Sequence, residues 1–285
     1  MRCEVCFRHC DIKEGETGFC GGRAAEEGRV FAANYGKITA LALDPIEKKP
    51  LNRFYPGSFI LSAGSYGCNL RCPFCQNSEI SWGPEARLFR ERARVMLPED
   101  LRDLALKYRR QGNIGLAFTY NEPLIGYEFV RDTAALVHEA GMKNVLVTNG
   151  TAELSVLREL SPYVDAMNID LKGFRDGWYG KVLGGSRKMV LDFIREAVKT
   201  CHVELTTLIV PGENDSEEEM RELADWIADI PDAAVNGGGK RIPLHITRFF
   251  PRFHMTDRPA TPVRKIYRLA EIAAERLAFV YTGNC

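Results

Sequence analysis

Short apolar runs alternate with stretches of helical periodicity along the chain from about residue 59 onward. In the helical stretches, apolar residues recur about every 3.6 positions, whereas the runs between them have the length of buried strands. This alternation is typical of βα units that build a parallel sheet. The pattern predicts strands over residues 59–63, 115–119, 144–148, 166–171, 202–210, 242–247 and 279–282.

Residues at the expected helix ends support three of the helices predicted between these strands. Pro98 suits the first turn of a helix, where its missing N–H costs no hydrogen bond. Ser216 and Glu219 form a capping box at the start of a second helix. Gly141 suits the end of a third, just before the strand predicted from residue 144.

About six βα units fit either a complete or partial TIM-type barrel or an open doubly wound sheet. Periodicity does not choose between these folds, but in both the loops after the carboxyl ends of the strands form the active site. Residues 1–56 do not follow this βα pattern. They are rich in cysteine and glycine at first and continue with short apolar runs. The sequence therefore predicts a small Cys-rich N-terminal module over residues 1–56 and an α/β barrel region over 57–285.

The amino-acid composition argues against some classes of binding partner. The chain has 285 residues, and its 38 Lys and Arg balance its 38 Asp and Glu, so the basic surface of a nucleic-acid binder is not expected. No apolar stretch reaches the length of a membrane span, and the first residues lack the apolar segment of a secretory signal. We expect a cytoplasmic protein with neither nucleic-acid nor membrane partners.

The nine cysteines are clustered. In a reducing compartment, clustered cysteines are more often metal ligands or redox centres than disulfides, and an odd number cannot pair completely. Two stand alone, Cys201 and Cys285. The others form two groups, which are Cys3, Cys6, Cys10 and Cys20, and then Cys68, Cys72 and Cys75.

The central group follows the first predicted barrel strand, in the loop where such folds keep their chemistry. Its cysteines have x3 and x2 spacings, and aromatic Phe74 precedes the last of them. Three thiolates can hold three irons of a 4Fe–4S cluster and leave the fourth iron open to a ligand, whereas electron-transfer clusters use four. The alternative is a structural zinc site that takes its fourth ligand from elsewhere in the chain.

The sequence resembles the radical S-adenosylmethionine (SAM) superfamily, and within it the pyruvate formate-lyase-activating-enzyme-like branch called AmmeMemoRadiSam system radical SAM enzymes. The resemblance rests on the N-terminal cysteines with residues 18–21, and on residues 44–51, 67–77, 118–123 and 244–251. It implies a partial (β/α)6 barrel, a 4Fe–4S cluster on the central cysteines, and SAM bound at the open iron.

The same resemblance implies an activity. The reduced cluster would cleave SAM to methionine and a 5′-deoxyadenosyl radical, which abstracts hydrogen from a substrate that the sequence does not identify. An activating-enzyme-like role makes a partner protein or a pathway partner a candidate, and the electron would come from a donor such as flavodoxin or ferredoxin. A competing hypothesis is a non-enzymatic zinc-binding scaffold for protein interaction, which leaves the polar residues at the strand ends unexplained.

The resemblance also assigns residues at the strand ends to SAM. Glu122 occupies a Gly-Gly-Glu-Pro type motif that contacts the methionine amine, with Tyr120 and Asn121 in place of the two glycines. The next two strand ends would line the ribose and the methionine carboxylate, although local turns and caps explain such residues too. His245 fits a buried core histidine and a cofactor contact equally well. The predicted cofactor residues are Asn121, Glu122, Thr148, Asn149, Asp170, Lys172 and His245.

The N-terminal cysteines have x2, x3 and x9 spacings and supply enough thiolates for a closed tetrahedral site. Structural zinc, a second iron–sulfur cluster and no metal all remain open. We expect such a site to hold the N-terminal module against the barrel, outside the radical-forming centre. Relatives commonly continue past a Gly-Asn pair like Gly283-Asn284 into a tail with two more cysteines, so a truncated carboxyl end is a further possibility.

Overall fold

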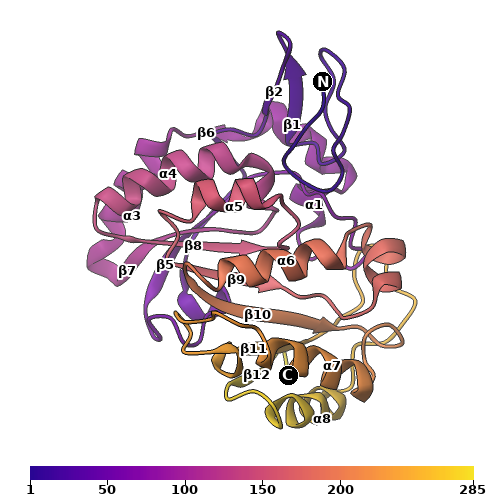
Figure 1. Cartoon of the computed structure of the whole chain (residues 1–285). Coiled ribbons are helices and arrows are strands. Elements are labelled where there is room, and N and C mark those ends of the chain that lie inside the picture. Colours follow the sequence, from indigo (N-terminus) through magenta and orange to yellow (C-terminus); the bar gives the residue numbers. More distant parts are fainter.

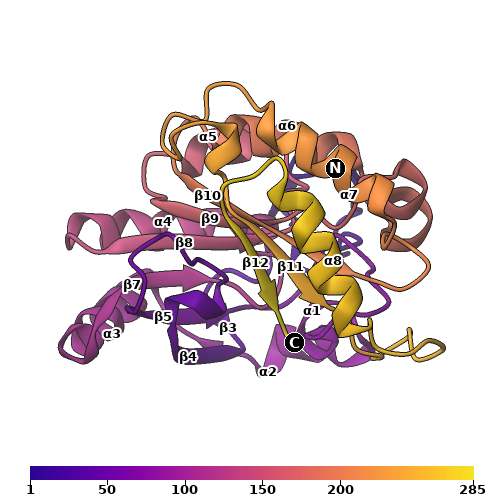
Figure 2. The same cartoon turned by 90° about the horizontal axis from the view of Figure 1, so that it is seen from below.

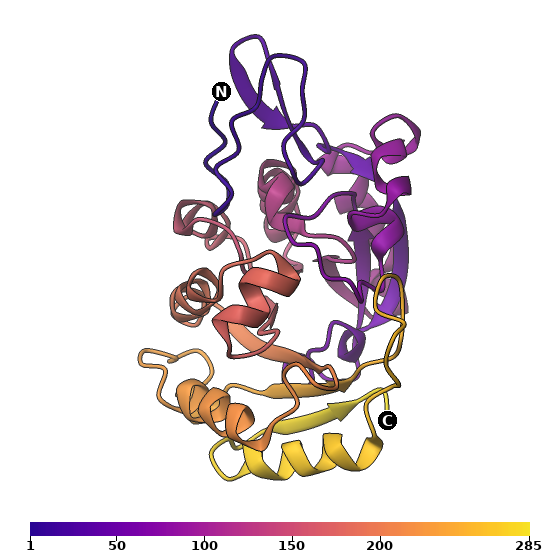
Figure 3. The same ribbon diagram turned by 90° about the vertical axis from the view of Figure 1, so that its right-hand side faces the viewer.

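The computed structural model describes residues 1–285. Its centre is an eight-stranded sheet in the order β12-β11-β10-β9-β8-β7-β5-β4. The two edge strands do not pair, so the sheet curves round without closing (Figure 3). Seven strands run parallel, namely β5 (Phe59–Gly64), β7 (Asn113–Phe118), β8 (Lys143–Thr148), β9 (Ala166–Asp170), β10 (His202–Ile209), β11 (Leu244–Arg248) and β12 (Val280–Gly283).

Helices lie in every connection between neighbouring parallel strands and cover the outer face of the sheet (Figures 1 and 2). Six βα units precede the final strand, so the predicted partial (β/α)6 barrel is confirmed, and periodicity alone could not have made this choice. The helices are α1 (Ser78–Ser81), α2 (Phe89–Arg92), α3 (Pro98–Lys107), α4 (Tyr127–Glu139), α5 (Leu154–Leu160), α6 (Arg187–Ala197), α7 (Glu217–Ala228) and α8 (Val263–Ala274).

The predicted helix ends are also confirmed. Pro98 is the first residue of α3. The Ser216 hydroxyl accepts a hydrogen bond from the Glu219 backbone N–H at 3.1 Å, which caps α7 as predicted. The Glu219 carboxylate accepts from the Phe174 N–H at 2.6 Å instead, so the second bond of the predicted capping box does not form. Gly141 follows α4 with a φ of +69°, a left-handed conformation that favours glycine. No helix has the length and apolar character needed to cross a membrane.

The N-terminal region is divided between a separate hairpin and the barrel. Strands β1 (Arg23–Glu26) and β2 (Arg29–Ala32) form their own antiparallel sheet, which projects from the barrel in Figure 1. A second small sheet pairs β3 (Lys37–Ile38) with β6 (Arg94–Val95). Strand β4 (Ala40–Pro45), in contrast, pairs antiparallel with β5 along its whole length. The barrel sheet therefore begins at residue 40, before the boundary predicted at residue 56.

The segment from 46 to 54 fills part of the barrel interior. Ile46, Leu51 and Phe54 pack in a small apolar group against residues of β5, β7, β8 and β9. The backbone N–H groups of Asn52 and Arg53 donate to the buried Glu204 carboxylate at 3.0 and 2.7 Å. These contacts join residues about 150 positions apart, and they make this segment a wall of the interior cavity.

Candidate active site

A cavity of about 670 Å³ opens inside the barrel at the carboxyl ends of the strands. This volume lies within the range of ligand-binding pockets in proteins. The loops after β5, β7, β8 and β9 line it together with β10, β11 and β12. All three central cysteines and all seven predicted cofactor residues contribute to the lining, which contains Cys68, Cys72, Cys75, Asn121, Glu122, Thr148, Asn149, Asp170, Lys172 and His245.

The three central cysteines occupy the loop between β5 and α1. Burial raises the pKa of all three thiols, and that of Cys72 reaches about 12. Two N–H groups point at the Cys68 Sγ, from the Leu70 backbone at 3.4 Å and from the Asn149 amide at 3.7 Å. A buried thiolate needs a positive partner as well as such donors, and metal coordination supplies one.

The donor set fits an iron–sulfur cluster. Three cysteines from one short loop face a large polar cavity, and the neighbouring groups leave space for a further ligand. No group of three or more His, Cys, Asp or Glu side chains is arranged to hold a single metal ion as the structure stands. The fit therefore rests on the identity of the donors and their surroundings, and not on a closed coordination geometry.

Glu122 is buried beneath the cavity surface and receives three hydrogen bonds. The Thr148 hydroxyl and the Leu124 N–H donate to Oε1 at 2.6 and 3.1 Å, and the Asn149 N–H donates to Oε2 at 2.8 Å. Burial nevertheless raises the pKa of Glu122 to about 7, and these bonds only partly oppose that effect. A carboxylate has about four acceptor positions, so one position, on Oε2, stays free for a ligand.

Asn121 holds the loops together. Its Oδ1 accepts from the Ser65 N–H at 2.9 Å, and its Nδ2 donates to the Gly67 carbonyl at 3.1 Å. Both partners lie just after β5, so this amide ties the end of β7 to the beginning of the cysteine loop. These bonds support a positioning role for Asn121, and its predicted contact with the cofactor stays a prediction.

Tyr120 adopts a left-handed conformation with a φ of +73°. Glycine adopts this conformation without strain, which is a physical reason for the glycine expected at this position in relatives. Here the Tyr120 hydroxyl donates to Asp44 at 2.8 Å, and Lys49 pairs with the same carboxylate at 2.7 Å. Sequence reasoning missed this trio, whose members come from β4, the segment after it and the loop after β7.

Asp170 and Lys172 form an ion pair at 2.8 Å beside the cysteine loop. Burial acts to lower the pKa of Lys172, but the neighbouring charge of Asp170 outweighs burial and raises the pKa, so the ammonium stays protonated. A π-helical turn, Trp178–Leu183, fixes the backbone of Lys172, since Trp178 donates to its carbonyl at 2.7 Å. The pair is neutral as a whole, and it holds the Lys172 ammonium in a fixed position near the cysteines.

His245 is a buried, hydrogen-bonded histidine that also borders the cavity, and its contact with the cofactor stays a prediction. It lines the cavity and stacks on Tyr281, and its Nε2 lies 2.6 Å from the carboxylate of Glu204. Although burial acts in the opposite direction, hydrogen bonds from His202 and His245 lower the pKa of Glu204 to about 2. Sequence reasoning missed Glu204, whose only signal is a carboxylate in the middle of an apolar strand.

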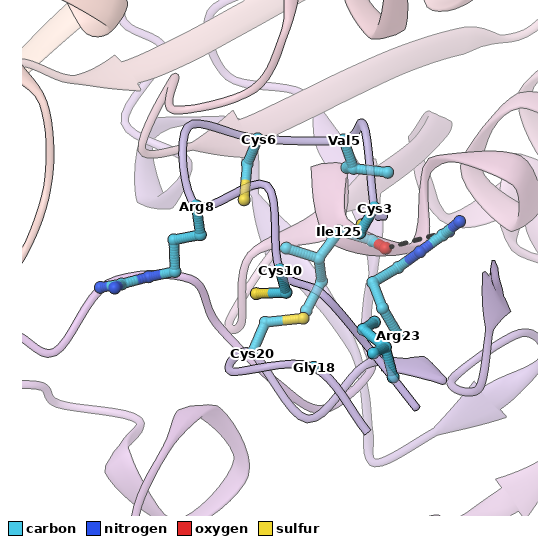
Figure 4. A pocket seen from close by; sticks show the side chains of 10 residues that line it. Cys3, Val5, Cys6, Arg8, Cys10, Gly18, Cys20, Arg23 and Ile125 are labelled. Carbon is cyan, nitrogen blue, oxygen red and sulfur yellow. Dashed lines mark hydrogen bonds between the residues drawn. The ribbon is translucent and has the colours of Figure 1, made fainter. Parts of the chain in front are cut away.

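The four N-terminal cysteines lie outside this cavity and gather around a second, much smaller one (Figure 4). Cys3, Cys6 and Cys20 are buried, and none of the four forms a disulfide. Apolar Val5, Ile12 and Ile125 complete much of the lining, with Arg8 at one side. The structure therefore keeps the two cysteine groups in separate sites.

Cysteines on the first loop of an open barrel, facing a cavity of cofactor size, are the arrangement of an iron–sulfur enzyme. The family model for the Radical SAM superfamily matches residues 63–227, which is more than half of the chain. The chain therefore belongs to the Radical SAM superfamily, and it is an enzyme that carries out SAM-dependent radical chemistry with a 4Fe–4S cluster. This membership argues against the competing hypothesis of a non-enzymatic zinc-binding scaffold.

Relatives place the chain near activating enzymes. It is 42% identical over its full length to uncharacterized protein MJ0808 of Methanocaldococcus jannaschii, of which it covers 81%. It is 27% identical to the pyruvate formate-lyase 1-activating enzyme of Escherichia coli over 58% of this chain and 66% of that enzyme. SuiB of Streptococcus suis shares the fold with a TM-score of 0.57 at 14% identity, over 78% of this chain and 48% of SuiB. The narrower AmmeMemoRadiSam assignment stays a prediction.

Proposed function

We propose that this enzyme binds SAM in the barrel cavity and reductively cleaves it there, with Cys68, Cys72 and Cys75 as ligands of the cluster. The observation that carries this proposal is the convergence of the three thiols and the polar strand ends on one cavity. When bound, the cluster supplies the electron that converts SAM to methionine and a 5′-deoxyadenosyl radical. The chain itself must bind and orient SAM and exclude water.

The methionine part of SAM carries an ammonium and a carboxylate, and the cavity offers a partner to each. The free acceptor position of Glu122 suits the ammonium, and its three protein donors fix the direction in which it points. Lys172 suits the carboxylate, because its ammonium stays charged beside Asp170. Asp170 pairs with Lys172 through Oδ2, so its Oδ1 remains available to a hydroxyl group of the ribose. The Asn149 amide is already bonded to Cys68, Asn69 and Thr151, so it serves to position this end of the cavity. His245 lines the cavity as well.

The experiment that tests this proposal is anaerobic turnover without added substrate. Protein reconstituted with iron and sulfide should give a broad visible absorbance band, and dithionite plus SAM should give 5′-deoxyadenosine and methionine in equal amounts. Colourless protein that contains zinc but no sulfide, or protein with an intact cluster that yields no 5′-deoxyadenosine, would contradict the proposal.

We further infer that the hydrogen donor is a segment of a partner protein. The relatives named pyruvate formate-lyase-activating enzymes support this class of substrate, since their names describe action on another enzyme. The cavity lining includes exposed polar side chains, which are those of Lys48, Gln76 and Asn77. The test uses candidate partners grown in deuterated medium, because deuterium transfer into 5′-deoxyadenosine occurs only from the true hydrogen donor.

A basic cleft supports an acidic protein as the electron donor, such as a flavodoxin or a ferredoxin. The cleft has a volume of about 680 Å³, and three arginines, Arg71, Arg87 and Arg90, line it without any carboxylate. It reaches the back of the cysteine loop, where Trp82 donates to the Cys72 carbonyl at 3.2 Å. An acidic carrier would meet complementary charge there, close to the cluster ligands.

The arginines can be tested separately from the chemistry. Arg87→Glu with Arg90→Glu should slow cluster reduction by flavodoxin or ferredoxin about tenfold or more at low salt, and should leave reduction by dithionite unchanged. Arg110→Glu is the matched control, because Arg110 is exposed just before β7, at the opposite end of that strand from the cavity. Equal donor rates in the double variant and the wild type would contradict this docking site.

A further inference from the structure

The N-terminal cysteine group has the features of a site that binds one metal ion. Four thiols from the first 20 residues line one small cavity whose remaining wall is largely apolar (Figure 4). Cys3, Cys6 and Cys20 are 5%, 7% and 8% exposed. A short, loop-rich segment does not need four thiols to fill a core, and buried thiols close to one another readily share a soft metal ion.

Two tight turns shape the loops that carry these cysteines. Gly21, directly after Cys20, has a φ of +75°, and His9, directly before Cys10, has a φ of +38°. The His9 N–H donates to the Cys6 carbonyl at 3.1 Å, and the Cys3 N–H donates to the Cys10 carbonyl at 2.9 Å. These backbone bonds hold Cys3, Cys6 and Cys10 close together around the cavity.

The small volume of the cavity favours a single metal ion over an iron–sulfur cluster. It has about 10 Å³ of free space, close to that of a single water molecule. A 4Fe–4S cluster has eight core atoms and would have to push the four segments apart, whereas one ion needs only rotation of the thiols toward each other. Such rotation is required, because the thiols are not yet arranged to hold an ion.

We propose that Cys3, Cys6, Cys10 and Cys20 bind one tetrahedral metal ion, zinc or iron, and that this ion fixes the loop that carries Cys68. Tetrahedral coordination by four thiolates is typical of both metals. The first part of this proposal stands by itself. The second rests on the proposed function, because it concerns the cluster ligand Cys68.

A direct hydrogen bond joins the two cysteine groups. The Cys68 N–H donates to the Cys20 carbonyl at 3.2 Å. Gly67 approaches the same carbonyl so closely, at a φ of +93°, that a Cβ on residue 67 would lie 2.7 Å from the oxygen. Cys20 is therefore in backbone contact with the residues on which the cluster loop begins.

Arg8 makes a second connection. Its Nε donates to the Asn69 carbonyl at 2.8 Å, and its Nη2 donates to the Gly184 carbonyl at 2.6 Å. Arg8 lies between Cys6 and Cys10 in the sequence, so an ion held by these two cysteines restrains the arginine. Through these contacts the ion would position Cys68 without being a ligand of the cluster.

Metal analysis tests the first part on the full chain. The variant Cys68→Ala/Cys72→Ala/Cys75→Ala removes the barrel cluster, and it should retain one zinc or iron per chain without acid-labile sulfide. Adding Cys3→Ser/Cys6→Ser should remove that ion, whereas adding Cys201→Ser should not, because Cys201 is buried at the start of β10. Zinc and iron supplied separately distinguish the two metals. No bound metal, or about four irons with sulfide, would overturn the single-ion site.

A spectroscopic measurement tests the same site without the Cys3→Ser/Cys6→Ser change, in case that variant folds poorly. Replacement of the ion by Co²⁺ in the triple-alanine variant should give a thiolate-to-cobalt absorption band typical of four sulfur ligands. The band should weaken in Cys10→Ser alone and persist in Cys201→Ser. A cobalt spectrum that is unchanged by Cys10→Ser would remove this cysteine from the site and contradict the four-thiolate arrangement.

The positioning role has a separate readout. With the barrel cluster intact, Cys3→Ser/Cys6→Ser should raise the Kd for SAM at least threefold and alter the electron paramagnetic resonance spectrum of the reduced cluster with SAM, while 5′-deoxyadenosine still forms slowly. An unchanged Kd and spectrum would overturn this role. If the wild type forms no 5′-deoxyadenosine at all, the proposed function fails, and the metal count of the N-terminal site is unaffected.

Discussion

Acidification should weaken SAM binding through Glu122. Its pKa is raised from 4.5 to about 7 by burial, so the carboxyl is about half ionised at pH 7 and about one-tenth ionised at pH 6 in the SAM-free enzyme. Only the ionised form can pair with the ammonium of SAM. Binding at pH 6 must therefore first remove a proton from most molecules.

The size of the effect follows from these fractions. Affinity for SAM should fall about fivefold between pH 7 and pH 6, which corresponds to about 1 kcal/mol. The comparison stays at or below pH 7, because an α-amino group is half deprotonated at about pH 7.7. The rise in the pKa of Glu122 itself corresponds to about 3 kcal/mol at 1.36 kcal/mol per pH unit, and pairing with the ammonium would offset much of that cost.

The assay is anaerobic titration calorimetry of cluster-loaded protein at pH 6.0, 6.5 and 7.0, in two buffers of different ionisation enthalpy. Proton release on binding should be larger at pH 6.0 than at pH 7.0. Glu122→Gln should bind SAM at least tenfold more weakly and without this pH dependence, while Glu139→Gln, at an exposed position near the end of α4, should match the wild type. His245 also lines the cavity, so a pH dependence that persists in Glu122→Gln would refute the assignment to Glu122.

Three further outcomes follow from the site. Cys72→Ala should abolish the visible absorbance of the cluster and the formation of 5′-deoxyadenosine, whereas Cys201→Ala, measured in parallel, should keep both. Lys172→Met should weaken SAM binding at least tenfold by calorimetry with the cluster spectrum retained, because it removes the charge placed beside Asp170; unchanged affinity would exclude this contact. Glu204, whose pKa is lowered from 4.5 to about 2, should contribute up to about 3 kcal/mol of stability above pH 4.5 that is lost as the pH falls toward 2. Urea unfolding of cluster-free protein should show that Glu204→Gln is less stable at pH 7 by a similar amount, and equal stability would contradict it.

Local signals in the sequence were sufficient for the secondary structure and for the central cysteine group. The strands coincide with short apolar runs because a parallel strand is buried on both faces, and the ends of α3 and α7 are set by residues within one helical turn. Cys68, Cys72 and Cys75 lie within eight consecutive residues, so their shared location follows from the chain itself. The position of that loop after a strand followed from the βα pattern.

Contacts between distant residues could not be read in the same way. Strand β4 carries an apolar run like the others, and only its antiparallel pairing with β5 places it in the barrel. From its sequence position, Asn121 is predicted to contact the cofactor, whereas its amide joins two loops whose residues are more than 50 positions apart. The pairing of His245 with Glu204 likewise depends on neighbouring strands, since the two residues are 41 positions apart in the chain.

The sequence by itself was enough to predict which residues carry the chemistry, because cysteine spacing and strand ends are local properties of the chain. The tertiary structure decided how these residues are used. Burial raises the pKa of Glu122 and the thiols, and three donors from separate segments set the one free acceptor position of Glu122. Folding also brings Cys20 against Cys68 across 48 residues, which connects the N-terminal cysteines to the cluster loop. Desolvation and hydrogen-bond partners depend on the whole fold, and no local pattern records them.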